Sequence, residues 1–149
     1  MTEEIGGVQL REKAIELMRI KRRYKRLDVA IHELGVQLTV NLLKARHLEV
    51  PKWQVNPGAE SGVDITALSD NEMVLAAEFT AHEPIYDRKI GPRFGATQQS
   101  NIRYDIGKLL RTNARTKYLV VATLAAERAA RAQFDLKGIE LVNLDLASD

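Results

Sequence analysis

The chain has 149 residues, which is enough for one domain with a buried core but too few for two ordinary domains. Its 45% hydrophobic and 28% charged residues are typical of a globular protein, and no apolar run is long enough to span a membrane. The absence of cysteine excludes disulfides and thiolate metal sites, and it fits a cytoplasmic protein.

The first part of the chain predicts helix. Apolar residues recur at three- and four-residue spacing from Val8, and a second apolar stripe runs from Leu27 to Arg46, before Pro51. Gly35 lies within this stripe, where it weakens a helix unless it permits close packing against a sheet. We expect one domain, 1–149, with a basic helical extension over 1–26 and a core over 27–144.

The extension carries a basic cluster. Clustered lysine and arginine can neutralise phosphates, although a solvated helix face explains the cluster equally well. The residues that we consider for phosphate contact are Arg19, Arg22, Arg23, Lys25 and Arg26.

The middle of the chain predicts strands. Lys52–Val55 is a short strand candidate, and residues 56–58 form a predicted turn. Two apolar strands follow, Gly62–Leu68 and Met73–Thr80, and each carries one carboxylate: Asp64 in the first and Glu78 in the second. A carboxylate is costly to bury unless it meets a cation or hydrogen-bond donors, so two that converge would make a metal site.

The hairpin register decides whether these carboxylates meet. Side chains alternate between the faces of a strand, so Glu78 and Thr80 face one way while Leu75, Ala77 and Phe79 face the other. A loop of three or five residues places Asp64 opposite Glu78, whereas a loop of two or four sends them to opposite faces. A metal site therefore requires an odd loop or a bulge.

The last third of the chain predicts alternating helices and strands. A long connection, Pro84–Gly95, leads to a helix over Thr97–Asn113, then to a buried strand at Tyr118–Thr123, a helix at Ala125–Phe134 and a strand at Ile139–Leu144. The expected class is α/β, with a central mixed sheet flanked by helices. In the helix 97–113 we expect Ile102, Ile106, Leu109 and Leu110 inside, and Gln98, Gln99, Arg103, Lys108 and Arg111 outside.

The order of elements and the two carboxylates resemble the PD-(D/E)XK nuclease superfamily, which has the restriction-endonuclease-like fold. The matching parts cover about Leu27 to Thr123, with Gly62-Val63-Asp64-Ile65 on one strand and Glu78-Phe79-Thr80 on the next. The resemblance implies that Asp64, Glu78 and the Phe79 carbonyl bind Mg²⁺ or Mn²⁺. It also implies that Glu33, on the leading helix, lies near the metal.

One position departs from the family pattern. The family places lysine two residues after the second acidic residue, and this chain has Thr80 there, which supplies no positive charge. Some members recruit lysine from elsewhere, and Lys89 in the long connection is the best candidate. Weaker candidates are Arg88, Arg93, Gln98, Gln99 and Lys108.

The resemblance implies a metal-dependent DNA endonuclease, with a restriction-type enzyme as one form, that works as a homodimer because one protomer carries one site. The side chains expected to contact DNA, beyond the basic cluster, are Arg88, Lys89, Arg93, Gln98, Gln99 and Arg103. Two alternatives stay open. One is a catalytically degraded nuclease fold that binds DNA or completes a larger complex. The other is an interaction module in which Glu78 forms a salt bridge with the neighbouring helix.

Overall fold

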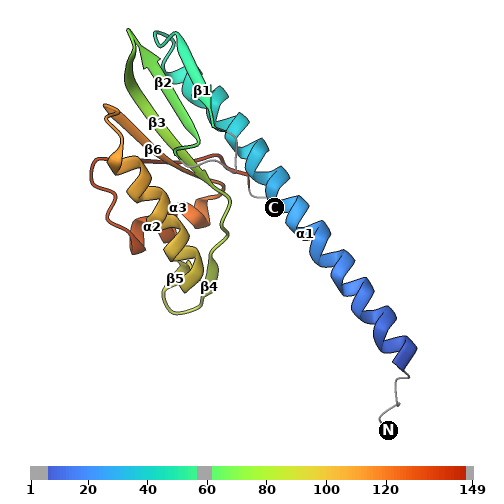
Figure 1. The fold of residues 1–149 in the computed structure, drawn as a ribbon. Helices are drawn as coiled ribbons and strands as arrows, with labels where there is room; N and C mark the ends of the chain where they lie inside the picture. Colours follow the sequence, from blue (N-terminus) through green and yellow to red (C-terminus); the bar gives the residue numbers. More distant parts are fainter. Residues whose placement is uncertain (1–6, 57–61, 147–149) are drawn as a thin grey trace. The chain divides into compact units, whose positions relative to one another are not determined.

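The computed structural model describes residues 7–56 and 62–146, in which five strands follow the first helix and helices and strands alternate after them (Figure 1). Residues 57 and 58 of the predicted turn lie outside these ranges. In chain order the elements are α1 (Gly7–Arg46), β1 (Lys52–Val55), β2 (Ile65–Ser69), β3 (Glu72–Thr80), β4 (Ile85–Asp87), β5 (Gly91–Arg93), α2 (Ala96–Arg111), β6 (Thr116–Val121), α3 (Leu124–Gln133) and β7 (Glu140–Asn143).

The chain comprises two compact units, residues 1–31 and 32–149. In the first unit every described residue, from 7 to 31, is helical and exposed to solvent. The second unit holds the sheet. No helix among the described residues is long and apolar enough to cross a membrane.

The main sheet is mixed, as the sequence predicts. Its strand order is β1-β2-β3-β6-β7. The first three strands pair antiparallel, whereas β3 with β6 and β6 with β7 pair parallel. Parallel neighbours need a crossover, and α2 and α3 supply the two crossovers here. The predicted α/β class is confirmed.

Each face of the sheet has its own core. On one face, α2 and α3 pack through Ile102, Leu109 and Ala126 against alternate residues of the strands. On the other face, residues 36–43 of α1 pack against Leu75, Ala77, Phe79 and their neighbours. The predicted alternation along β3 is therefore confirmed, and it leaves Glu78 on the α2 face.

Gly35 is the point of closest approach between α1 and the sheet. A Cβ at this position would lie 2.0 Å from Cε1 of Phe79, whose ring fills the space beside the glycine. Close packing against a sheet is one of the roles that the sequence allows for Gly35, and the structure confirms it. Thr39 donates a hydrogen bond of 2.7 Å from Oγ1 to the Gly35 carbonyl, which completes this buried turn of the helix.

The predicted long connection, Pro84–Gly95, contains a small hairpin of β4 and β5. Asp87 forms its turn, because Oδ1 accepts hydrogen bonds from the backbone N–H groups of Lys89 (2.7 Å) and Ile90 (3.2 Å). Gly91 follows with a φ of 86°, a left-handed conformation that suits glycine. Asp87 and Gly91 are residue types that favour such a turn. The strands β4 and β5 have three residues each, which is too short for a periodic pattern to predict them.

We predict that Gly35→Ala destabilises the protein, because the added methyl group must displace the Phe79 ring. Overpacking of this kind costs about 1–3 kcal/mol in unfolding free energy. Gly107→Ala is the matched control, since the nearest atom to a Cβ there is the flexible Arg111 side chain at 3.3 Å. The control should be neutral or stabilising by up to about 1 kcal/mol. Chemical denaturation of the three proteins measures the difference, and equal stability of the two variants would contradict the packing.

Candidate active site

A tight turn and a bulge set the register of β2 against β3. Ser69 pairs with Glu72, so only Asp70 and Asn71 form the turn, and both have positive φ, 52° and 62°. This geometry is that of a two-residue hairpin turn with both central residues left-handed. Nearer the strand centre, Leu68 pairs with Met73 whereas Ala67 pairs with Leu75, so Val74 is the additional residue of a bulge.

The bulge decides where the carboxylates lie. A two-residue turn alone would send Asp64 and Glu78 to opposite faces of the hairpin. The additional residue at Val74 reverses that parity, and beyond it Ile65 pairs with Ala77. Asp64 directly precedes Ile65 and Glu78 directly follows Ala77, so the two acids come opposite each other. The bulge that the sequence analysis required is present.

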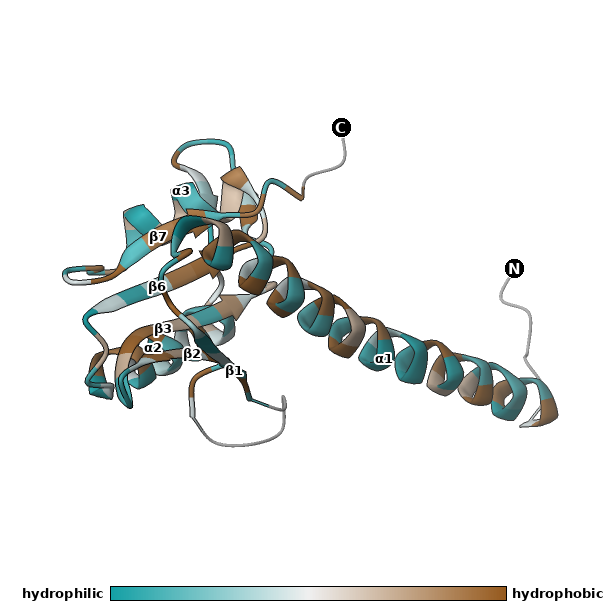
Figure 2. Ribbon diagram, turned by 90° about the horizontal axis from the view of Figure 1, so that it is seen from above, coloured by the Kyte–Doolittle hydropathy of each residue, from teal (hydrophilic) through white to brown (hydrophobic). Residues whose placement is uncertain are grey.

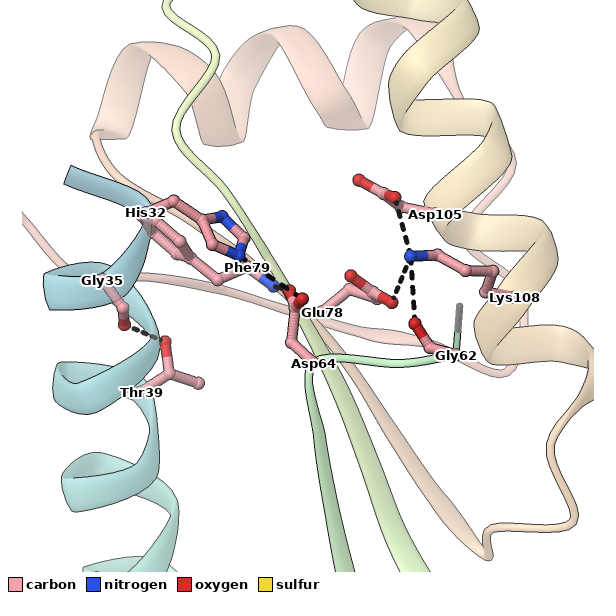
Figure 3. A network of polar contacts seen from close by, with 9 residues as sticks. All are labelled: His32, Gly35, Thr39, Gly62, Asp64, Glu78, Phe79, Asp105 and Lys108. Atoms are coloured by element: carbon pink, nitrogen blue, oxygen red, sulfur yellow. Dashed lines mark hydrogen bonds and ion pairs between the residues drawn. The ribbon is translucent and has the colours of Figure 1, made fainter. Parts of the chain in front are cut away.

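Asp64 is fixed at the start of β2 by two donors (Figure 3). Its Oδ2 accepts a hydrogen bond of 2.9 Å from the backbone N–H of Phe79, and its Oδ1 lies 3.4 Å from Nε2 of His32. His32 belongs to α1, and its ring also lies against the Phe79 ring, with centroids 5.9 Å apart. The carboxylate is held in place by these contacts and is only 8% exposed.

Glu78 is more deeply buried, at 2% exposure, and faces a lysine. Lys108 reaches it from α2, with Nζ 2.9 Å from Oε1 (Figure 3). The same ammonium lies 3.5 Å from Oδ1 of Asp105 and 3.2 Å from the Gly62 carbonyl. Among the described residues, Oε1 nevertheless accepts no hydrogen bond of good geometry. Lys108 therefore contributes charge to Glu78 more than a well-aligned hydrogen bond.

The environment separates the two carboxyl groups electrostatically. Burial, together with the hydrogen bond and the charge of Asp64, raises the pKa of Glu78 to about 9, and Lys108 only partly opposes this. Burial also acts to raise the pKa of Asp64, but hydrogen bonds from His32, Glu78 and the Phe79 N–H outweigh it and lower that pKa. At neutral pH the pair therefore holds one proton, on Glu78, and one negative charge, on Asp64.

The surrounding groups complete the charge balance. The pKa of His32 is raised, chiefly by its hydrogen bond to Asp64. Burial lowers the pKa of Lys108, but its contacts with Glu78 and Asp105 outweigh that effect and raise it, so the ammonium stays charged. Burial raises the pKa of Asp105, and the charge of Lys108 opposes this rise. The site is a compact set of acids in which positive charge comes from one lysine and one histidine.

Two carboxylates are what the site offers a metal ion. Among residues 7–56 and 62–146, no group of three or more histidine or acidic side chains is arranged to hold one. Mg²⁺ is often bound by one or two carboxylates while it keeps several waters, so the pair Asp64 and Glu78 meets the minimum. The oxygen donors are hard, and Glu78 Oε1, which accepts no well-formed hydrogen bond from a described residue, already lies 2.9 Å from the Lys108 ammonium, so its position attracts positive charge. The donor set therefore fits Mg²⁺ or Mn²⁺.

The other predicted catalytic residues differ in their placement. Thr80 is buried, and its Oγ1 accepts a hydrogen bond of 3.4 Å from the N–H of His82. Phe79 takes part through its backbone N–H. Glu33 is exposed, and it is His32, one residue earlier, that contacts Asp64. Lys89 lies exposed in the turn between β4 and β5, where its backbone N–H donates to Asp87.

Of the candidates for the missing lysine, Lys108 is the one that the structure brings to Glu78. We expected it on the outer face of the helix, and that expectation was wrong. Leu110, expected on the inner face, is 52% exposed. Asp105 lies on the side of α2 that is centred on Ile102 and Leu109, and Lys108, three residues later, extends its side chain to Asp105 and Glu78.

The predicted DNA-contacting residues fall into two groups. Gln98, Gln99 and Arg103 have structural partners: Gln98 bonds Gly95 N–H and the Glu83 carbonyl, Gln99 bonds the Phe94 carbonyl, and Arg103 bonds Gln99. Gln98 and Gln99 tie the residues that flank the β4–β5 hairpin to α2, whereas Arg103 is exposed and its hydrogen bond to Gln99 lies within α2. The others are exposed to solvent: Arg88, Lys89 and Arg93 around the hairpin, and Arg19, Arg22, Arg23, Lys25 and Arg26 in residues 7–31.

Sequence reasoning missed His32 and Asp105. Asp105 had a usable signal, because it follows Ile102 by three residues and so shares the buried side of the helix, where an acid needs a partner. His32 precedes Gly35 by three residues on α1, but nothing in the sequence shows that Asp64 lies beside it.

No protein-family model, curated protein or solved structure matches this chain.

We predict that, in a chelating buffer, unfolding free energy falls as the pH rises from about 4.5 toward 9. The folded state binds the Glu78 proton more tightly than the unfolded state, so this contribution is complete below pH 4.5 and is lost through pH 9. One such group contributes at most about 1.4 kcal/mol per pH unit. Glu78→Gln removes the titration, and its stability should depend less on pH across this range. Identical pH profiles of the two proteins, measured by urea denaturation, would contradict the raised pKa.

Proposed function

We propose that this chain is a metal-dependent DNA endonuclease of the PD-(D/E)XK type. The observation that carries the proposal is the convergence of Asp64 and Glu78, which a bulge brings opposite each other, with the Lys108 ammonium 2.9 Å from Glu78. Two buried acids on neighbouring strands are the part of the family's constellation that this chain retains, and a lysine from α2, rather than from the strand, lies beside them.

The arrangement of the elements supports the same proposal. A helix, three antiparallel strands, a helix and a strand parallel to the third follow in the order of the family core, in α1, β1, β2, β3, α2 and β6. The acids occupy the positions expected from that core, at the start of β2 and near the end of β3. We accordingly propose the restriction-endonuclease-like fold for residues 32–146.

Asp64 and Glu78 would hold the Mg²⁺ or Mn²⁺ ion. When bound, such an ion polarises a phosphate oxygen and lowers the pKa of a bound water. The residues prepare for it in two ways. The Phe79 N–H and His32 keep Asp64 ionised and oriented. The proton on Glu78 neutralises the second carboxylate in the absence of a bound cation. Loss of that proton gives the second anionic ligand.

Lys108 is proposed to supply the positive charge that Thr80 cannot. Its ammonium stays protonated between Glu78 and Asp105, and only 16% of the side chain is exposed. A cation held beside the reacting phosphate stabilises the negative charge that develops in the transition state. In this proposal Lys108, rather than Lys89, replaces the family lysine, and Asp105 positions it.

A second candidate function follows from the same contact. The Lys108–Glu78 ion pair, with the proton shared by the acids, partly compensates the buried charge without any metal. This observation favours a degraded nuclease fold that binds DNA, or completes a larger complex, without cleaving it. The two candidates differ in what the site does with a divalent cation.

Cleavage of supercoiled plasmid and branched DNA with Mg²⁺ or Mn²⁺ tests the proposal. Wild-type protein should cut, and Asp64→Asn, Glu78→Gln and Lys108→Met should each lose activity, by roughly a hundredfold or more. Lys89→Met is the matched control, because it removes the same charge from the exposed hairpin turn. It should retain most of the activity.

Two outcomes would contradict this assignment. If Lys89→Met abolishes cleavage while Lys108→Met does not, the lysine has been placed wrongly. If the folded wild-type protein binds these substrates but cuts none of them with either metal, the degraded candidate takes its place.

Metal binding gives a prediction that does not depend on the DNA substrate. Mg²⁺ or Mn²⁺ should raise the thermal unfolding midpoint of the wild-type protein, since a ligand that binds only the folded state stabilises it by about 2.7 kcal/mol at a hundred times its Kd. Asp64→Asn and Glu78→Gln should lose this shift. A shift equal in all three proteins would place the cation elsewhere.

A further inference from the structure

Apolar residues recur at heptad spacing along α1, from residue 10 to residue 31, and Figure 2 shows apolar positions alternating with polar ones along this helix. Four of these residues are spaced seven apart along the chain. Two of the four are each followed, three residues later, by another apolar residue. This is the a and d pattern of a coiled coil. The a positions are Leu10, Leu17, Tyr24 and Ile31, and the d positions are Lys13, Ile20 and Leu27.

The six apolar members of this seam, which we call the heptad seam, are uncovered. They are between 38% and 63% exposed. All other described residues of the first unit are exposed too, so nothing within it stabilises the helix by burial. A lone helix of this length is marginal in water, and most helical stability comes from packing an apolar face. The heptad seam therefore needs a second apolar surface to pack against if this helix is to be stable in water.

The same spacing continues at Leu34 and Leu38, which are 64% and 43% exposed. In this part of α1 the residues that pack on the sheet are Val36, Val40 and Leu43. They occupy the f and c positions of the same heptads, which lie across the helix from a and d. The sheet thus covers the opposite side of the helix and leaves the heptad line open.

The charges beside the heptad seam identify the partner as a second copy of this chain. In a parallel pair, each g residue lies near the e residue of the next heptad on the other helix. The charged g residues are Glu16 and Arg23, and the e residues five positions later are Lys21 and Asp28. In such a pair Glu16 would meet the partner subunit's Lys21, and Arg23 would meet the partner subunit's Asp28. Both contacts join opposite charges.

An antiparallel pair centred on the heptad seam is disfavoured by the same residues. It would bring g near g and e near e, so Arg23 would approach the partner subunit's Arg23, and Lys21 the partner subunit's Lys21. We propose that residues 10–31 form a parallel, in-register, two-stranded coiled coil with a second copy of this chain. This inference is independent of the proposed nuclease activity.

The basic cluster, apart from Arg23 at its g position, remains accessible in this dimer. Arg19 and Arg26 occupy c positions, Lys25 a b position and Arg22 an f position, all on the outer surface of a coiled coil. Pairing along the heptad seam therefore covers apolar side chains and leaves these cations in solvent.

Sedimentation velocity or light scattering of the full chain tests the dimer. The wild-type protein should have twice the chain mass, and Leu17→Glu with Leu27→Glu should reduce it to the monomer. The matched control is Ile15→Glu with Val29→Glu, which adds the same charge at exposed f positions of the same helix, 42% and 59% exposed in the wild type. The control should stay dimeric. A monomeric wild-type protein, or equal dissociation of both variants, overturns the proposal.

Cysteine cross-linking tests orientation and register, because the chain has no native cysteine. Leu17→Cys and Leu27→Cys, made separately, should each form a disulfide-linked dimer under mild oxidation, since a faces a and d faces d in a parallel pair. Val29→Cys, at an f position, is the control and should form far less. Cross-linking only when the Leu17→Cys and Leu27→Cys proteins are mixed would indicate antiparallel helices, in which a packs against d, and would overturn the proposal.

Discussion

The burial of two carboxylates side by side is the constraint on which the site depends. An ionised carboxylate away from water costs several kcal/mol even after the protein relaxes around it, and a second one beside it adds repulsion. The structure meets this cost through specific partners. Asp64 keeps its charge by accepting from the Phe79 N–H and lying against His32. Glu78 takes up a proton and lies beside the Lys108 ammonium.

Each of these partners is supplied by a different part of the fold. The close approach of α1 to the sheet, which Gly35 permits, brings His32 within 3.4 Å of Asp64. The crossover from β3 to β6 runs through α2, and α2 brings Asp105 and Lys108 to the other side of the acids. The bulge in the β2–β3 hairpin places Asp64 and Glu78, the acids that these two helices contact, opposite each other. The packing of helices on both faces of the sheet thus determines the charges that surround Asp64 and Glu78.

The sequence predicted the parts of the site that depend on local pattern. Strand periodicity and apolar composition located both acids and the face of Glu78, and helix periodicity located α2 within two residues at each end. What it could not predict depends on contacts far apart in the chain. His32 and Asp64 are 32 positions apart, and Glu78 and Lys108 are 30 apart, so no local pattern reports their approach.

The hairpin shows the limit most clearly. Asp70 and Asn71 favour a tight two-residue turn, which by itself places Asp64 on the wrong face. Only the extra residue at Val74 corrects the parity, and a bulge carries no sequence signal comparable to that of a turn. The sequence could state that a bulge was needed but could not locate it.

At neutral pH the pair Asp64 and Glu78 holds one proton, on Glu78, and we propose that a divalent cation displaces it. Carboxyl ¹³C NMR titration of the wild-type protein, with Glu78→Gln to assign the signal, measures this directly. We expect Glu78 to titrate near pH 9 in a chelating buffer and well below that value with Mg²⁺. Titration of Glu78 near its ordinary value in both buffers would contradict it, and would leave the Lys108–Glu78 contact as a simple structural ion pair.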